Sequence, residues 1–151
     1  MTDTHAPFIR ESIALANAAV AKGNEPFGAL LVKDGEVVLR AENTIATGHD
    51  PTNHAEMNLV RLAVAQFDAD FLAQCTLYTS TEPCAMCAGA IYWGNIGRIV
   101  FGCSESRLME IAGGGLGIDS RNVLANASRS IEIVGPVIED EAVQPHLNYW
   151  K

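Results

Sequence analysis

Two short segments of the chain combine residue types that bind metal ions with one that can move protons. Residues 54–56 read HAE and residues 83–87 read PCAMC, and each segment follows a loop and opens a predicted helix. Cys84 and Cys87 are three residues apart, so they share one face of their helix. In the first turn of a helix, free N–H groups and the helix dipole lower the pKa of a thiol. This position therefore favours the thiolate, which is the form that binds zinc.

The number of candidate ligands distinguishes a catalytic zinc from a structural one. His54, Cys84 and Cys87 make three nitrogen and sulfur ligands, whereas a structural zinc usually takes four and a catalytic zinc keeps one position for water. Glu56 follows His54 by two residues, so on an ideal helix the two side chains diverge by about 200°. From there the carboxylate can reach a water beside the metal without coordinating the metal. Because two thiolates weaken the acidity of zinc, a base is needed nearby, and we expect Glu56 to be that base.

The text around both segments resembles one enzyme superfamily. Residues 50–56 read DPTNHAE and residues 77–90 read LYTSTEPCAMCAGA, which together contain the H-x-E…P-C-x-x-C pattern of zinc-dependent nucleobase deaminases. The chain resembles the cytidine deaminase-like superfamily along nearly its whole length. Within it, the chain is most similar to the branch of guanine, cytosine and tRNA adenosine deaminases. One departure is Asn53, where many relatives have alanine.

The resemblance implies a role for each residue at the metal. His54, Cys84 and Cys87 would hold zinc, and no further cofactor is expected. Glu56 would take a proton from water and deliver it first to a ring nitrogen and then to the departing amine. The alternative from another class is a non-catalytic zinc protein with a structural or degenerate site, which the intact Glu56 disfavours.

The resemblance also implies a set of substrate contacts around the metal. Asn43, eleven residues before His54, would hydrogen-bond the base, because a primary amide offers a donor and an acceptor together. The backbone N–H of Ala55 would meet a base carbonyl or ring acceptor, and the backbone carbonyl of Glu82 would hold the leaving amine. Phe27, in a Pro-Phe-Gly turn, would line the pocket.

For two aromatic residues, both a structural and a substrate-binding interpretation remain open. Trp93 follows an Ile-Tyr pair that resembles guanine deaminases, and it fits either a pocket wall or a dimer core. Tyr149 lies in an aromatic C-terminal stretch. That stretch is either a helix docked on its own domain or a tail that caps a substrate pocket, including that of a neighbouring subunit. We include both residues among the candidate substrate contacts.

The periodicity of apolar residues predicts helices and strands that alternate after an opening hairpin turned at residues 34–35. The expected helices span residues 8–22, 54–67, 83–93, 104–111 and 139–149, and the expected strands span residues 29–32, 36–39, 76–79, 98–101 and 131–134. Such alternation favours a first strand pair that is antiparallel and later strands that are largely parallel. We therefore expect one domain over residues 1–151 with three α/β/α layers and a mixed five-stranded sheet, and the resemblance implies that this is the cytidine deaminase-like fold. The glycine-rich residues 113–117 are predicted to be a mobile surface loop.

Composition excludes several other classes of protein. Hydrophobic residues make up 48% of the 151 residues, so the chain has enough apolar surface for a core and is not disordered. Of the four cysteines, Cys75 and Cys103 are expected to be core residues, which leaves no disulfide framework. The first ten residues lack the apolar stretch of a secretory signal, and no stretch is long and apolar enough to span a membrane. We expect a cytoplasmic protein with no membrane partner.

Charge separates the candidate substrates. The formal net charge is −8, and residues 131–150 contain no lysine or arginine, so that only Lys151 is basic at this end. A tRNA deaminase must neutralise several phosphates, so this acidity favours a free base over nucleic acid. The first expectation is deamination of guanine to xanthine and ammonia, and the alternatives are cytosine, isocytosine or an aminotriazine. A tRNA adenosine deaminase is disfavoured, and a homodimer is expected.

Overall fold

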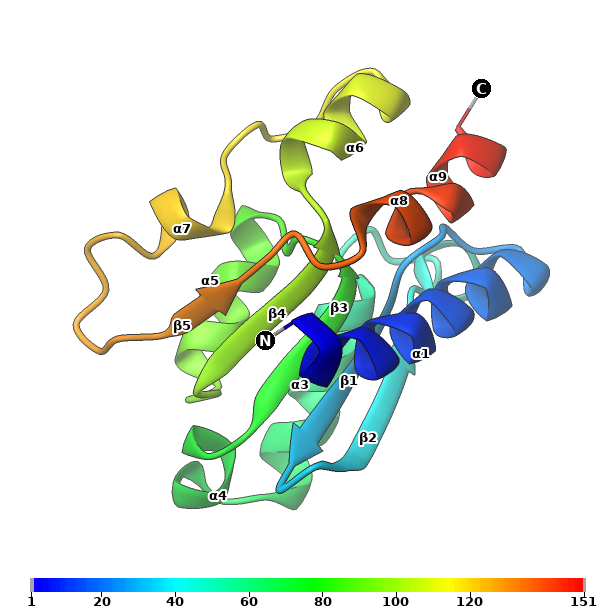
Figure 1. The fold of residues 1–151 in the computed structure, drawn as a ribbon. Helices are drawn as coiled ribbons and strands as arrows, with labels where there is room; N and C mark the ends of the chain where they lie inside the picture. The colour runs from blue at the N-terminus through cyan, green and yellow to red at the C-terminus, as the bar shows by residue number, and fades with distance from the viewer. Residues whose placement is uncertain (1, 151) are drawn as a thin grey trace.

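Five strands form one mixed sheet in the computed structural model, which describes residues 2–150 (Figure 1). The strands are β1 (Gly28–Lys33), β2 (Glu36–Glu42), β3 (Thr76–Thr81), β4 (Arg98–Cys103) and β5 (Glu132–Val134), in the spatial order β2-β1-β3-β4-β5. β1 runs antiparallel to both β2 and β3, whereas β3 with β4 and β4 with β5 are parallel. The expected mixed sheet is thereby confirmed. Lys151, which entered the charge argument, lies outside the described residues.

Helices cover both faces of the sheet, which confirms the three layers (Figure 1). The helices are α1 (Thr2–Ala21), α2 (Ile45–Gly48), α3 (Ala55–Gln66), α4 (Ala69–Ala73), α5 (Ala85–Trp93), α6 (Glu105–Ala112), α7 (Ser120–Val123), α8 (Glu139–Ala142) and α9 (Gln144–Tyr149). α3 and α5 pack on one face, and α1 and α8 pack on the other. Within residues 2–150, no helix combines the length and the apolar character that crossing a membrane requires.

Alternate residues along the central strands supply the two apolar cores, as the period of a strand requires. Leu31, Leu77 and Ile99 are fully buried against α3 and α5. Their neighbours Leu30 and Val100 are fully buried on the other face, beneath α1. Both faces of the central strands are therefore apolar, and this rigid sheet carries the helices that present the candidate site.

Two predicted helices differ substantially in the structure, whereas the ends of the other three shift by at most two residues. α1 begins at Thr2, six residues before its predicted start, because His5 and Phe8 pack their rings against Tyr78 of β3. The predicted helix over residues 139–149 is divided into α8 and α9. Pro145 stands at the start of α9, and a proline there removes the N–H that a continuous helix would use.

Three short helices, α2, α4 and α7, were not predicted. In α4 and α7 the first turn is capped by an aspartate side chain, since Asp68 accepts the Phe71 N–H and Asp119 accepts the Asn122 N–H. Both aspartates are N-cap signals that are visible in the sequence. Four or five residues are too few for an apolar period to reveal such a helix.

Candidate active site

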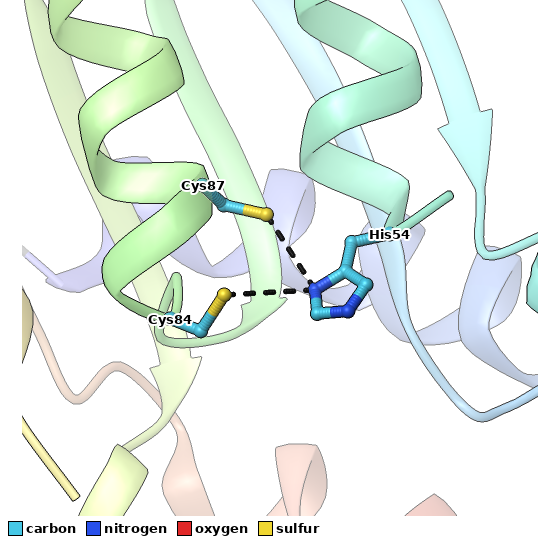
Figure 2. Close-up of side chains that lie close together, drawn as sticks. All are labelled: His54, Cys84 and Cys87. Atoms are coloured by element: carbon cyan, nitrogen blue, oxygen red, sulfur yellow. Dashed lines mark hydrogen bonds between the residues drawn. The ribbon is translucent and has the colours of Figure 1, made fainter. Parts of the chain in front are cut away.

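His54, Cys84 and Cys87 form a cluster at the point where α3 and α5 begin (Figure 2). His54 and Cys84 are the N-cap residues of the two helices rather than members of the first turn, and their extended backbones let both side chains face across the gap. The His54 Nδ1 atom lies 3.6 Å from the sulfur of Cys84 and 3.6 Å from the sulfur of Cys87. All three candidate ligand atoms lie within 4.8 Å of one another.

These separations fit a tetrahedral zinc ion. Zn–S bonds of about 2.3 Å and Zn–N bonds of about 2.0–2.1 Å place sulfur and nitrogen about 3.6 Å apart at the tetrahedral angle. The donor set of one imidazole and two thiols is likewise one that zinc prefers. The three residues therefore suit zinc in both chemistry and spacing, and they leave one coordination position for a small molecule.

Without a metal, the thiols of Cys84 and Cys87 have different pKa values. The neighbouring Cys87 thiol and His54 lower the pKa of Cys84 to about 4. The proximity of Cys84 and burial raise the pKa of Cys87. The hydrogen bond to Cys84 also raises the pKa of His54. The side chains of His54, Cys84 and Cys87 therefore share a proton at the place where they converge. A divalent cation bound at this place would displace that proton.

Glu56 is a buried carboxyl group beside this cluster. It is 4% exposed, and burial raises its pKa to about 7, with the negative Cys84 adding to the effect. The Thr79 hydroxyl lies 3.2 Å from Glu56 Oε2 and 2.9 Å from the Thr81 carbonyl oxygen. A hydroxyl has one proton to give, so Thr79 donates either to ionised Glu56 or to Thr81. When Thr79 donates to Thr81, its oxygen can accept a hydrogen bond from neutral Glu56, so the same contact holds Glu56 in both protonation states.

A cavity of about 200 Å³ opens in front of the cluster. Its wall includes Phe27, His54 and Cys84, together with glutamates 25, 56, 82 and 105 and the glycine-rich loop after α6. No lysine or arginine is among the lining residues. A hollow of about 480 Å³ beside β2 and α3 is larger, but its lining contains neither histidine nor cysteine. Chemistry rather than size therefore identifies the candidate site.

The structure brings four of the predicted substrate contacts to this region. Phe27 lines the cavity, and Ala55 is buried as the first residue of α3, where its N–H lacks a partner within the helix. Asn43 is buried and donates its backbone N–H to the Phe27 carbonyl at 3.1 Å. The side-chain oxygen of Asn43 accepts the Ile45 N–H at 3.0 Å, so its NH₂ group is the part left to donate to a base. Glu82 stands at the end of β3 and also lines the cavity.

The structure does not bring Trp93 or Tyr149 to the same cavity. Trp93 ends α5 with 83% of its surface exposed, and it borders a separate hollow with Tyr92 and Arg129. Tyr149 is 37% exposed near the end of α9 and packs edge-on against Trp150. A contact of either residue with a substrate of its own subunit has no support in this arrangement, and both assignments stay predictions.

The side chain of Glu82 has a structural role that the sequence did not reveal. Its Oε1 accepts the Glu105 N–H at 2.9 Å, and its Oε2 accepts both the backbone N–H and the hydroxyl of Ser120, at 2.8 and 2.5 Å. One carboxylate therefore fixes the starts of α6 and α7 beside the metal cluster. No local signal marks this role, because all its partners are at least 23 residues away in the sequence.

The glycine-rich loop at residues 113–117 corrects another expectation. Its residues are exposed, as a surface loop requires, but Gly114, Gly115 and Leu116 also line the cavity. The interpretation as a surface loop without a site was therefore incomplete. Proximity to the cavity follows from the placement of α6, which local sequence does not reveal.

The C-terminal helix contacts the site region through His146. This side chain is 1% exposed, and its ring packs edge-on against Phe27 with centroids 5.1 Å apart. The Trp150 indole donates to Nδ1 at 3.0 Å, so the ring proton lies on Nε2, 2.7 Å from the Thr81 hydroxyl. Desolvation lowers the pKa of His146 to about 4, so it is a neutral structural group.

Several named deaminases have sequences related to this chain. A probable cytosine deaminase of Schizosaccharomyces pombe is 44% identical over 95% of this chain and 90% of its own. A guanine deaminase of Bacillus subtilis is 39% identical over 70% of this chain and 69% of its own. tRNA-specific adenosine deaminases are also among the relatives. These relatives are named as deaminases of three different substrates.

The fold is shared with solved deaminases, and a family profile covers the site. The structure of a guanine deaminase from Nitrosomonas europaea superposes with a TM-score of 0.82 at 25% identity, covering 94% of this chain and 82% of that one. The profile described as the cytidine and deoxycytidylate deaminase zinc-binding region matches residues 2–103, which run from α1 through β4 and include all three candidate ligands. The chain therefore belongs to the cytidine and deoxycytidylate deaminase family of zinc-binding enzymes.

Proposed function

We propose that the chain is a zinc-dependent hydrolytic deaminase of a free nucleobase, and that its substrate is guanine, which it converts to xanthine and ammonia. One observation carries this proposal. His54, Cys84 and Cys87 converge with tetrahedral spacing beside buried Glu56, in a cavity of about 200 Å³. Pockets for drug-sized ligands typically measure about 300–1,000 Å³, so this cavity suits a smaller molecule such as a single base.

The residues divide the chemistry among them. Bound zinc would act as a Lewis acid that makes water more acidic. Glu56 accepts a proton from the attacking water and returns it to a ring nitrogen. It then takes the second proton of that water, from the hydroxyl now on the ring carbon, and passes it to the departing amine, which leaves as ammonia. Thr79 holds the carboxyl group throughout this cycle, because its hydroxyl can donate to the charged form or accept from the neutral form.

Backbone and amide groups would orient the ring. The Asn43 NH₂ group and the Ala55 N–H are donors, so each suits a carbonyl or ring-nitrogen acceptor of the base. The Glu82 backbone carbonyl is an acceptor and would receive the leaving amine. Phe27 supplies an apolar edge for the ring, and His146 behind it keeps Phe27 in place.

The charge of the cavity supports a free base over a nucleotide or tRNA. Four glutamates line the cavity, and no lining residue is a lysine or arginine. A phosphate would be repelled there and would find no cationic partner. This argument concerns the surroundings of the metal cluster itself, so it is more specific than the net charge of the chain.

Cytosine is a second candidate substrate, because a probable cytosine deaminase has the higher identity over the longer alignment. Guanine and cytosine both present an amino carbon flanked by ring nitrogen, so Glu56 and the Glu82 carbonyl would serve either ring. The two candidates differ in ring size, and turnover measurements separate them.

An ammonia-release screen tests the proposed function. The zinc-loaded full chain is assayed with guanine, cytosine, isocytosine, ammeline, adenine, cytidine and guanosine. We expect turnover of guanine and weak or no turnover of the nucleosides. Glu56→Gln is expected to keep its zinc and lose about 10²- to 10⁴-fold in kcat. If no compound releases ammonia while zinc is bound, the chain is a non-catalytic zinc protein; binding of tRNA in a low-salt gel shift would contradict the charge argument.

The assembly proposed with this function is a homodimer. Trp93 supports it, because a tryptophan that is 83% exposed suits contact with another protein surface. We expect a dimer by analytical ultracentrifugation and a weaker dimer for Trp93→Ala. A wild-type protein that stays monomeric at assay concentrations would contradict this assignment.

A further inference from the structure

Glu105 is a buried carboxylate that the mechanism above does not use. It is the first residue of α6, is 6% exposed, and lines the cavity in front of the metal cluster. None of the ion pairs among residues 2–150 includes it. A carboxylate taken out of water without a cation is costly, and folding alone gives no reason to place one here.

The backbone around Glu105 is fixed to the metal-binding side of the cavity. The Glu105 N–H donates to Glu82 Oε1 at 2.9 Å, and Glu82 is two residues before Cys84. Ser104 caps the helix by accepting the Arg107 N–H at 3.2 Å. Glu105 is thus held at a defined place relative to the cluster rather than on a freely moving loop.

The glycine-rich loop packs closely over the same carboxylate. A Cβ atom on Gly115 would lie 3.4 Å from Glu105 Oε2, which is van der Waals contact, so the loop backbone lies directly beside the carboxylate. Burial raises the pKa of Glu105, and the nearby backbone of Gly117 partly offsets this rise by favouring the charged form. The loop shields Glu105 from bulk water, while the carboxylate still borders the cavity.

The contacts proposed above leave one N–H donor of a free base without a partner, and Glu105 can accept a hydrogen bond from it. The amidine edge of the ring faces Glu56 and the Glu82 carbonyl, and the ring acceptors face the donors of Asn43 and Ala55. Guanine N1–H belongs to the amidine edge, so the remaining donor is the ring N–H at the position where a nucleoside carries its sugar, which is N9–H in guanine and N1–H in cytosine. Among the cavity side chains, only glutamates 25 and 105 are left to accept it.

We propose that Glu105 accepts this ring N–H and so selects free bases over nucleosides and N-alkylated bases. The inference rests on the proposed function. Glu105 is favoured over Glu25 because it is nearly fully buried, whereas Glu25 is half-buried and can be hydrated. A hydrogen bond from a ligand to a shielded carboxylate discriminates more strongly than one to a carboxylate in water. Glu105 is therefore a specificity-determining residue on a wall without metal ligands.

Paired substrates test this role. The zinc-loaded full chain is compared on guanine with 9-methylguanine and on cytosine with 1-methylcytosine. We expect the wild type to favour the free base by about 10- to 100-fold in kcat/KM, the loss associated with one hydrogen bond to a charged group. Glu105→Gln should reduce this preference, and Glu105→Ala, which also makes room for the methyl group, should bring it close to one. Glu110→Gln, on the exposed side of the same helix, should keep the wild-type ratio.

A thermal measurement separates recognition from a structural role. Glu105→Gln removes an uncompensated buried charge, so we expect its melting temperature at neutral pH to equal or exceed that of the wild type while kcat/KM for the free base falls. A structural role would lower the melting temperature and reduce turnover of both substrates in parallel, and that result would overturn the proposal.

Binding separates this inference from the proposed function. Calorimetry with the zinc-loaded Glu56→Gln protein measures the same free-base preference without turnover. If free bases bind with the preference but the wild type releases no ammonia, only the proposed function fails. If both Glu105 variants keep the preference, or Glu25→Gln removes it instead, the assignment to Glu105 is wrong. If no base binds, both proposals fail.

Discussion

The two sides of the cavity are built in different ways. On the metal side, the ligands begin α3 and α5, and α3 buries Leu59, Val60 and Ala63 against the sheet. On the opposite side, α6 buries only Glu105 among its residues, and α7 buries only Ser120. That second side, which we call the cover (residues 104–123), is held by the hydrogen bonds of Glu82 more than by an apolar core.

This difference suggests a division of labour. A group that handles protons must keep its position, and a helix start packed on a rigid sheet provides that position. The cover needs only to recognise the rest of the ring, and this role tolerates less apolar packing. Regions with little apolar packing have lower local stability. Changes on the metal side should therefore affect kcat, and changes on the cover should affect KM and stability.

The largest effect should come from the metal ligands. Cys84→Ala removes one of three ligands, so we expect loss of bound zinc and activity at the uncatalysed background. Zinc content by mass spectrometry and ammonia release check both expectations. Cys75→Ala is the matched control, because Cys75 is buried beside β3 and donates to the Phe71 carbonyl. If Cys84→Ala retained both zinc and turnover, the cluster would not be the metal site.

A smaller effect on the same side is expected for Thr79. Thr79→Val keeps the shape of the side chain but removes the hydroxyl that contacts Glu56, so kcat should fall about 10- to 100-fold with KM nearly unchanged. Thr79→Ser restores the hydroxyl and should recover most of the rate. Equal kcat values for the valine and wild-type proteins would show that Glu56 is positioned without Thr79.

The metal side was the part that the sequence predicted best, and there is a physical reason. Ligand types, their spacing and the helix starts are local features, so His54, Cys84, Cys87 and Glu56 could be identified before any contact was known. One detail was missed: His54 and Cys84 are N-caps with extended backbones, a choice of one residue that periodicity does not resolve.

The cover was predicted least well, because its contacts are distant in sequence. No sequence motif marks Glu105, and Glu82 was considered only for its backbone carbonyl. Trp93 was grouped with the cavity from its neighbours in the sequence, whereas the direction of its side chain is fixed by the packing of α5. Three-dimensional proximity of this kind leaves no period or composition signal.

The attachment of the cover can be tested through Glu82. Glu82→Gln replaces two acceptor oxygens with one and turns an NH₂ group toward backbone donors, so we expect a loss of about 2–4 kcal/mol in unfolding free energy. KM should rise several-fold, while zinc content stays near the wild-type value. Urea unfolding and steady-state kinetics check this, and Glu110→Gln is an exposed control. A variant with reduced kcat and unchanged KM would contradict the division between the two sides.

The smallest effect on activity should come from His146, which contacts the cavity wall only from behind. Its pKa is about 4 in the folded protein and about 6.5 in the unfolded chain, so the unfolded chain binds the extra proton first as pH falls. The stability linked to this residue is complete above pH 6.5 and is lost as pH falls toward 4, by roughly 3 kcal/mol in total.

His146→Gln should therefore reduce the slope of unfolding free energy against pH by up to about 1.4 kcal/mol per unit in that window. If His146 is neutral and only supports Phe27, the His146→Gln variant should have nearly the wild-type kcat at neutral pH. A large fall in kcat without a change in the pH slope of the unfolding free energy would mean that α9 takes part in the chemistry.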